Sequence, residues 1–226
     1  MTTALRPPRA NRSLNSGSVS KSGLRLKWSE PSLEGGWMRQ DARKNRERIL
    51  AAAEEVFGSR GATGSTEEVA QRAGVGIATV FRHFPTKEEL IEAALLQHFD
   101  QLTERAYALA AKEDPATAWR DLVRAMIETG ATKLTLASAL ADREGVPDTA
   151  GAASNRLKVA VSEILGRAQD AGTVRPSVTI EEVYLLIRGL AQASATMRPR
   201  SDVLERAIDV VLTGLSQSGR LPVDNG

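Results

Sequence analysis

The sequence predicts an all-α fold of about nine helices, and three features of the 226-residue chain lead to this prediction. Apolar residues recur at helical spacing over most of the chain, three S/T-x-x-E capping boxes mark helix starts, and only 4% of the residues are aromatic. Strands are enriched in aromatic and β-branched residues, so this composition disfavours a β-sandwich. A chain of this length can form one or two domains with a substantial core.

The first 40 residues predict a disordered basic arm. They mix Ser, Gly, Pro, Arg and Asn without a sustained period, and their few apolar residues are too scattered to bury a face. The arm is either a solvated leader or a source of extra phosphate contacts.

Residues 40–61 predict the first helix, which Gly61 ends. Its apolar stripe follows the spacing i, i+1, i+4, i+7 and i+8, at Ile49, Leu50, Ala53, Val56 and Phe57. The second helix is short, because Ser65 and Glu68 form a capping box at its start and Gly74 ends it.

The third helix covers residues 77–83 and ends before Phe84-Pro85, because proline disfavours the helical conformation in the residue before it. Thr86 and Glu89 form a second capping box. It opens a long amphipathic fourth helix that is expected to continue past Tyr107.

Five further helices are predicted in the rest of the chain. Asp114 caps the first of them, with proline at its first helical position, and Gly130 is read as its stop. A third capping box, Thr179 with Glu182, opens the fourth of them. The five helices cover residues 114–130, 131–140, 152–171, 180–197 and 201–215, and residues 142–151 form a loop.

The composition excludes several classes of function. Without cysteine, the chain has no disulfide framework, thiolate nucleophile or cysteine-ligated zinc, and a reducing cytoplasm is the expected location. No apolar run approaches the roughly 18 residues of a membrane span, and the N-terminus lacks the apolar stretch of a signal peptide. The sequence therefore predicts a cytoplasmic protein with no membrane partner.

The charge distribution points to a polyanionic partner for the first third of the chain. Lys and Arg outnumber acids by seven to two in residues 1–40 and by eight to six in residues 41–87, whereas acids outnumber them by twenty to fifteen in residues 88–226. Two short helices with a glycine turn, followed by a long helix, are the parts of a helix-turn-helix, whose second helix enters the DNA major groove.

The run EEVAQRAGVGIATVFRHFPTKEEL closely resembles the DNA-binding domain of the tetracycline-repressor (TetR) family of bacterial transcriptional regulators. Matching positions are Val69-Ala70, Ala73-Gly74-Val75, Thr79, Phe81, His83-Phe84, Lys87 and Leu90. Gly76 departs from the family's capping serine, Ala78 from its glycine, and Phe81 from its tyrosine. The resemblance implies a helix-turn-helix domain over residues 41–102 and an effector-binding and dimerisation domain over residues 103–226.

Exposed residues at the start of the recognition helix can reach base edges, and nearby polar and basic residues can contact phosphates. Arg82 is the best candidate for reading guanine, and contact with a phosphate is the alternative. Lys87 is either a phosphate contact or a tolerated surface cation, and the resemblance places His83 near the DNA backbone. The full set of DNA-binding candidates is Arg43, Lys44, Ser65, Thr66, Gly76, Ile77, Ala78, Thr79, Phe81, Arg82, His83 and Lys87.

Residues 103–226 show no motif for catalysis, so we expect no enzymatic activity. The two histidines are too isolated for a metal site, and His98 is interpreted as a satisfied core histidine; no metal or cofactor is expected. The resemblance implies a small-molecule pocket and dimerisation through the last two helices, although the same apolar residues could form the chain's own core. Pocket candidates are Tyr107, Trp119, Met126, Leu134 and Leu136; dimer candidates are Leu185, Leu186, Leu190, Leu204, Ile208, Val211 and Leu212.

The sequence thus predicts a homodimeric regulator that binds double-stranded DNA at an inverted-repeat operator. The resemblance implies a repressor that a small-molecule effector releases from the operator. Two alternatives stay open: a constitutive helix-turn-helix protein without an effector, and, less favoured, an α-helical enzyme.

Overall fold

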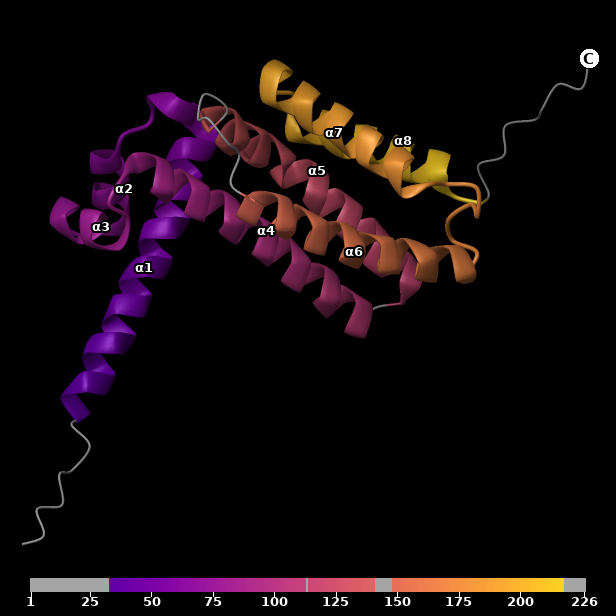
Figure 1. Ribbon diagram of the computed structural model, residues 1–226. Coiled ribbons are helices and arrows are strands. Elements are labelled where there is room, and N and C mark those ends of the chain that lie inside the picture. The colour runs from indigo at the N-terminus through magenta and orange to yellow at the C-terminus, as the bar shows by residue number, and fades with distance from the viewer. Residues whose placement is uncertain (1–32, 113, 141–147, 218–226) are drawn as a thin grey trace, which may run out of the picture.

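The computed structural model describes residues 33–112, 114–140 and 148–217, and these form an all-α protein. This part of the chain forms eight α-helices, with the 3-10 turn η1 (Gly61–Thr63) after the first; Figure 1 shows how the helices are arranged. The helices are α1 (Leu33–Arg60), α2 (Thr66–Ala73), α3 (Ile77–His83), α4 (Lys87–Lys112), α5 (Pro115–Ala139), α6 (Asp148–Asp170), α7 (Ile180–Met197) and α8 (Ser201–Leu215).

The N-terminal unit is a helix-turn-helix whose turn depends on one glycine. Ser65 and Glu68 form the predicted capping box at the start of α2. At its end Gly74 adopts a left-handed conformation, with φ of 65°, and the next amide, Val75 N–H, donates back to Ala70 O at 3.1 Å. This conformation strains residues that carry a Cβ, which explains glycine at the turn.

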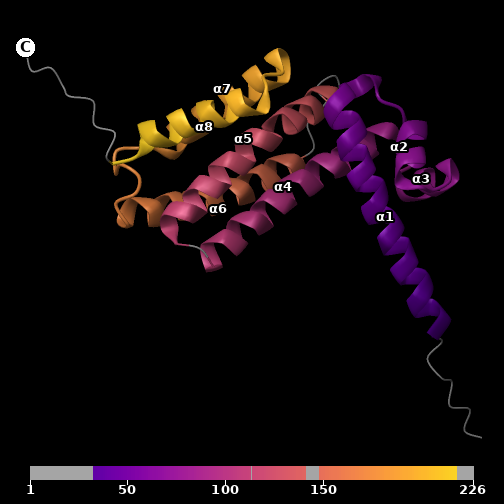
Figure 2. The ribbon, with the colours of Figure 1, turned by 180° about the vertical axis from the view of Figure 1, so that it is seen from behind.

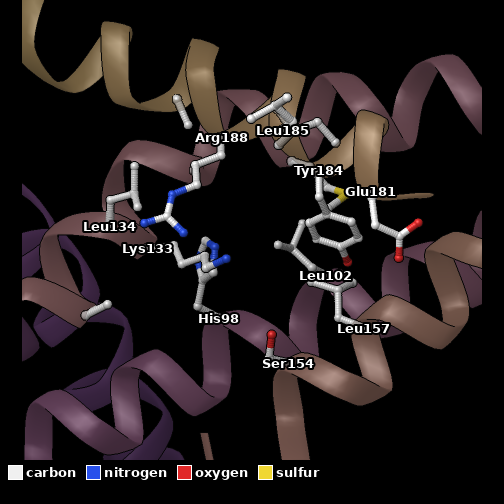
Figure 3. Close-up of a pocket in the computed structure, with 15 residues that line it drawn as sticks. His98, Leu102, Lys133, Leu134, Ser154, Leu157, Glu181, Tyr184, Leu185 and Arg188 are labelled. Carbon is white, nitrogen blue, oxygen red and sulfur yellow. The ribbon is translucent and has the colours of Figure 1, made fainter. Parts of the chain in front are cut away.

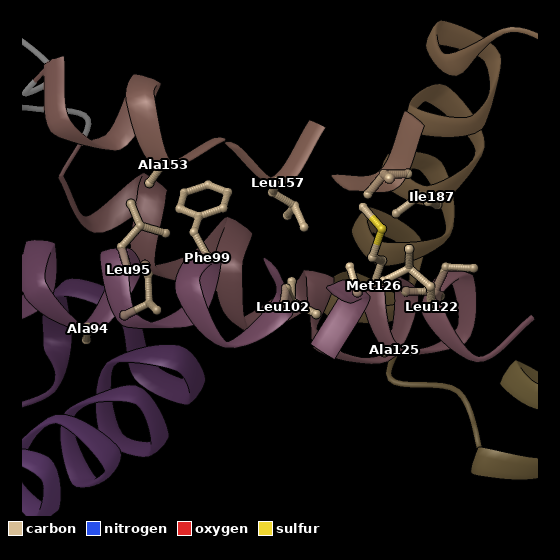
Figure 4. Close-up of a cluster of buried hydrophobic side chains, with 14 of the residues drawn as sticks. Ala94, Leu95, Phe99, Leu102, Leu122, Ala125, Met126, Ala153, Leu157 and Ile187 are labelled. Carbon is tan, nitrogen blue, oxygen red and sulfur yellow. The ribbon is translucent and has the colours of Figure 1, made fainter. Parts of the chain in front are cut away.

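The body packs helices against one another around α5. Helices α4 and α6 lie together on one side of it, and α7 and α8 lie against it as well (Figures 1 and 2). Figure 4 shows the buried cluster where α4, α5, α6 and α7 meet. Its members include Leu95, Phe99, Leu102, Leu122, Met126, Leu157 and Ile187.

The predicted helix break at Gly130 is wrong. Helix α5 runs without interruption from Pro115 to Ala139, so the body has one helix fewer than expected. Gly130 is buried against α7, where an added Cβ would lie 2.6 Å from the Cβ of Ala191. The glycine therefore permits close helix packing rather than ending a helix.

Two predicted helix starts are also placed too late. Helix α1 begins at Leu33, so residues 33–40 belong to a helix rather than to the predicted arm, whose residues 1–32 lie outside the described chain. Extending a formed helix adds a backbone hydrogen bond per residue and requires no apolar face, so periodicity does not mark the start. Helix α6 begins at Asp148, so residues 148–151 are helical rather than part of the predicted loop, whose residues 142–147 lie outside the described residues.

No helix in the described part of the chain is long and apolar enough to span a membrane.

Candidate nucleic-acid interface and ligand cavity

Helix α3 exposes one face and buries the other. Val80 is fully buried, whereas Ile77, Ala78, Phe81 and Arg82 are exposed. The four exposed positions follow the spacing i, i+1, i+4 and i+5, so they share a face of the helix. Within the set that the sequence singled out for base reading, Thr79 is half-buried beside this face.

Basic side chains flank this unit on α1. Arg43 and Lys44 are exposed, and Arg43 forms a 3.5 Å ion pair with Glu47, both side chains being largely in solvent. An exposed pair of this kind contributes little to stability and can exchange one partner for a phosphate at small cost.

Ser65, Thr66 and Lys87 already have structural roles. The Ser65 hydroxyl accepts from Glu68 N–H at 3.2 Å as the helix cap, and the Thr66 side chain is buried. Lys87 Nζ donates to Ala62 O at 2.6 Å and lies over the ring of Phe57. This bond of Lys87 could not be predicted from local sequence spacing, because its partner is 25 residues away.

The remaining two candidates lie at the ends of α3. Gly76 is the N-cap, with extended backbone geometry and no capping side chain, as expected. His83 is half-buried, and its ring centroid lies 6.3 Å from that of Phe84.

A cavity of about 530 Å³ lies within the body between α4, α5, α6 and α7. Among the predicted pocket residues, Met126 and Leu134 line it. The other three lie elsewhere: Tyr107 is half exposed, whereas Trp119 and Leu136 are buried in the core. Apolar spacing identifies the inner face of a helix but does not separate residues at a cavity from residues in a filled core.

The cavity wall carries a cluster of nitrogen-bearing side chains that the sequence did not predict. Figure 3 shows His98 from α4, Lys133 from α5 and Arg188 from α7 gathered at one side. His98 is only 2% exposed; its Nδ1 lies 2.8 Å from Glu54 Oε1, and its Nε2 is buried without a partner. The interpretation of His98 as a satisfied core histidine is therefore right for one ring nitrogen and wrong for the other.

Burial perturbs two other groups of the cavity. It lowers the pKa of Lys133, and the positive charge of Arg188 lowers it further. Burial raises the pKa of Tyr184 to about 12, and the Tyr184 hydroxyl is buried without a hydrogen-bond partner. Both shifts reflect a site where charge is poorly solvated.

Helices α7 and α8 leave several apolar side chains exposed. Among the predicted dimer residues, Leu185 is 72% exposed, Leu186 is exposed as well, and four others are half-buried: Leu190, Leu204, Val211 and Leu212. Ile208 is fully buried within its own chain, because it faces the body, so its assignment to the dimer surface is wrong. Val203 and Val210 are exposed on α8, and their seven-residue spacing is the signal that could have identified them.

These features define a class of protein: a helix-turn-helix regulator with an all-helical, cavity-bearing body. Residues 49–94 match the family described as bacterial regulatory proteins, tetR family, and residues 114–217 match the C-terminal domain of SbtR-like transcriptional regulators. A TetR transcriptional regulator from Streptomyces coelicolor, SCO0520, has a similar structure: 33% identity, 76% of this chain and 98% of that chain covered, and a TM-score of 0.66. The chain belongs to the TetR family.

Two further comparisons agree with this assignment. The TetR regulatory protein from Mycobacterium vanbaalenii is 32% identical, with 79% of this chain and 99% of that chain covered and a TM-score of 0.66. The helix-turn-helix regulator SAUSA300_2515 of Staphylococcus aureus is 34% identical over 64 residues, which are 28% of this chain. The match spans 35% of the length of that curated relative.

Proposed function

We propose that this protein is a homodimeric transcriptional regulator that binds an inverted-repeat DNA operator through α3 and releases it when a small molecule occupies the body cavity. The observation that carries the proposal is the course of α4. This helix begins at Lys87, next to the helix-turn-helix, and its residues His98 and Leu102 line the cavity.

The exposed face of α3 supports base reading. Ile77, Ala78 and Arg82 can reach base edges in the major groove, and Thr79 can offer a hydroxyl or a methyl group. Arg82 has no ion-pair partner among the described residues, so it can donate two hydrogen bonds to guanine, to O6 and N7, without breaking an ion pair.

Phosphate contacts would come from the surrounding residues. Arg43 and Lys44 reach from α1, and His83 lies at the end of α3. Ser65, Thr66 and Gly76 have backbone amides at the starts of α2 and α3 that can face a phosphate even where the side chain is occupied. Phe81 supplies only apolar contact, to sugar or a thymine methyl.

The exposed apolar side chains of α7 and α8 support a homodimer. Leu185 and Leu186 on α7, with Val203 and Val210 on α8, would be covered by the same surface of a second copy in an isologous interface. A two-fold axis there would present one α3 from each subunit, which requires a DNA site with the same symmetry.

The continuity of α4, one uninterrupted helix from Lys87 to Lys112, supports release by a ligand. A molecule that shifts α4 at His98 also moves its first turn, and with it the spacing of the two recognition helices. Typical coupling of about 1–3 kcal/mol would change DNA affinity by roughly 5- to 150-fold. A constitutive binder remains the alternative, and it would show the same DNA affinity with the cavity empty or occupied.

Selection of DNA from a random double-stranded library tests the proposal. The full chain should enrich an inverted repeat whose half-site centres are about 34–36 Å apart, or a multiple of this, and footprinting should protect both halves. The Arg82→Ala variant is the matched control, and it should lose discrimination at one base position of each half-site. Failure to enrich any sequence, or a footprint over a single half-site, would contradict the proposal.

A further inference from the structure

We propose that the cavity selects an amphiphilic anion: an aliphatic molecule with one acidic head group, which Lys133, Arg188 and the Nε2 atom of His98 hold together. The head-group chemistry stands on the cavity alone. Only the statement that the bound molecule acts as an effector depends on the proposed function.

The first argument is that two cations share the cavity wall without a counter-ion. Neither Lys133 nor Arg188 forms an ion pair with any carboxylate of the described residues. Lys133 is partly buried, with its Nζ 5.2 Å from the centroid of the Phe99 ring, and Arg188 is exposed. Two neighbouring positive charges repel each other, and for Lys133 partial removal from water adds to the cost. An apolar side chain would line a cavity for a neutral ligand at no such cost, so the pair indicates a negative partner.

The second argument is the unpartnered nitrogen of His98. This ring is almost completely buried, and Glu54 occupies Nδ1 at 2.8 Å. Since a carboxylate accepts, Glu54 holds a proton on Nδ1, and the other nitrogen, Nε2, has no hydrogen-bond partner in a ring that lines the cavity. A ring that carries a proton on both nitrogens donates to Glu54 and to an acidic head group at the same time.

The rest of the wall explains why the ligand is amphiphilic and singly charged. The carboxylate of Glu181 also lines the cavity, but it already pairs with Lys158 at 3.1 Å, and Figure 3 shows it on the side opposite the cationic cluster. Most of the remaining lining is aliphatic, from Leu102, Met126, Leu134, Leu157, Leu185 and Ile187. An acyl chain suits this surface, since it offers no polar atoms that would lose hydrogen bonds on burial.

The same histidine connects the head group to the DNA-binding unit. Glu54 lies on α1, which packs against α2, whereas His98 lies on α4. An anion at Nε2 therefore acts on a group that is bonded to α1 through its other nitrogen. Through this contact the charge of the ligand can act on α1 of the DNA-binding unit, in addition to any movement of α4.

Calorimetric titration of the full chain with three ten-carbon probes tests the inference: decanoate, decan-1-ol and decylamine. Decanoate should bind about tenfold or more tightly than the alcohol, because charge-assisted hydrogen bonds are stronger than neutral ones, and decylamine should bind most weakly. Equal affinities for decanoate and decan-1-ol, no binding of decanoate, or a preference for decylamine would each overturn the inference.

Charge-removing variants locate the head group. Lys133→Met and Arg188→Met keep an unbranched side chain in place of the cation, so each should abolish most of the preference for decanoate while changing the affinity for decan-1-ol by no more than about twofold. Arg105→Met is the matched control, since Arg105 is exposed on α4 and does not line the cavity. Retention of the full preference in both Lys133→Met and Arg188→Met would overturn the assignment.

Two amide substitutions separate the nitrogens of His98. The side-chain amide of asparagine lies near the position of Nδ1, and that of glutamine near Nε2. His98→Gln should therefore retain more of the decanoate preference than His98→Asn, whereas thermal unfolding should show that both variants are folded. The reverse order would remove His98 from the head-group site.

Failure of this inference and failure of the proposed function give different results. A protein that selects operator DNA but does not prefer decanoate over decan-1-ol refutes the anionic head group alone. A protein that prefers decanoate, with the expected response to Lys133→Met, but selects no DNA refutes the regulator function alone.

Discussion

Substitution of Gly130 by alanine tests the contact between α5 and α7 that shapes the cavity. A Cβ at this position would lie 2.6 Å from the Cβ of Ala191, and this contact involves the stem of the side chain, which cannot rotate away. The two helices must separate by about 1 Å to reach ordinary van der Waals contact, and overpacking of this kind typically costs about 1–3 kcal/mol. Alanine also gains about 1 kcal/mol of helix propensity over glycine. The net loss of unfolding free energy is therefore as much as about 2 kcal/mol.

A double-mutant cycle isolates the contact. In the Ala191→Gly background the obstacle is gone, so Gly130→Ala should stabilise the protein by about 1 kcal/mol, and the coupling between the two sites should be about 1–3 kcal/mol. Gly166→Ala is the matched control, because an added Cβ there meets nothing within 4 Å and should stabilise α6 by about 1 kcal/mol. Urea unfolding followed by far-UV circular dichroism, at one protein concentration, measures all four variants and the parent.

If Gly130 ended a helix in the left-handed conformation, Gly130→Ala would destabilise the protein without any coupling to Ala191. If Gly130→Ala stabilised the protein as much as Gly166→Ala does, with no coupling to Ala191, the close approach of the two helices would be refuted.

Three other predictions concern the interface and the cavity. Arg82→Ala should cost about 1–3 kcal/mol of operator binding and relax discrimination at one base, whereas Lys87→Ala should weaken binding to all sequences alike and also lower the melting temperature through loss of the bond to Ala62 O. Fluorescence anisotropy with operator and random DNA measures both affinities. An equal loss of affinity for the two DNAs in Arg82→Ala would make Arg82 a phosphate contact. Burial raises the pKa of Tyr184 to about 12, so the contribution of the protonated Tyr184 to folding stability is complete below the ordinary tyrosine value of 10.0 and is lost as the pH rises toward 12. Tyrosinate absorbance should show this late ionisation, and Tyr184→Phe should remove it. Ionisation of Tyr184 at the ordinary value of 10.0 would place the phenol in water. Glu54→Gln should reduce the coupling between decanoate and operator by about twofold or more while leaving operator binding without decanoate intact; full coupling in this variant would exclude the contact through His98.

The helix-turn-helix could be predicted closely from the sequence because its signals are local. Capping residues lie three positions apart, and the glycine turn lies between two helices of about two turns each, so α2 and α3 were placed within a residue of their observed bounds. The role of Gly130 could not be predicted from the sequence, because glycine both ends helices and permits close packing. The residue that decides between the two roles, Ala191, is 61 positions away.

The cavity could be predicted only in part for the same reason. Apolar periodicity identified the inward faces that include Met126 and Leu134, but the cationic cluster brings together side chains from α4, α5 and α7. Lys133 and Arg188 look like ordinary surface residues in sequence, and only the packing of their helices turns them toward one space. The contact of His98 Nδ1 with Glu54 likewise joins two different helices, and the two residues are 44 positions apart in the sequence.

The most direct test of the account is whether ligand and operator weaken each other's binding equally. Decanoate affinity should be measured by calorimetry with and without saturating operator, and operator affinity with and without saturating decanoate, at one salt concentration. The account predicts weaker binding in both directions by the same factor, about 5- to 150-fold, because the coupling free energy is shared. Decanoate affinity that is identical with and without operator would contradict control of DNA binding through the cavity.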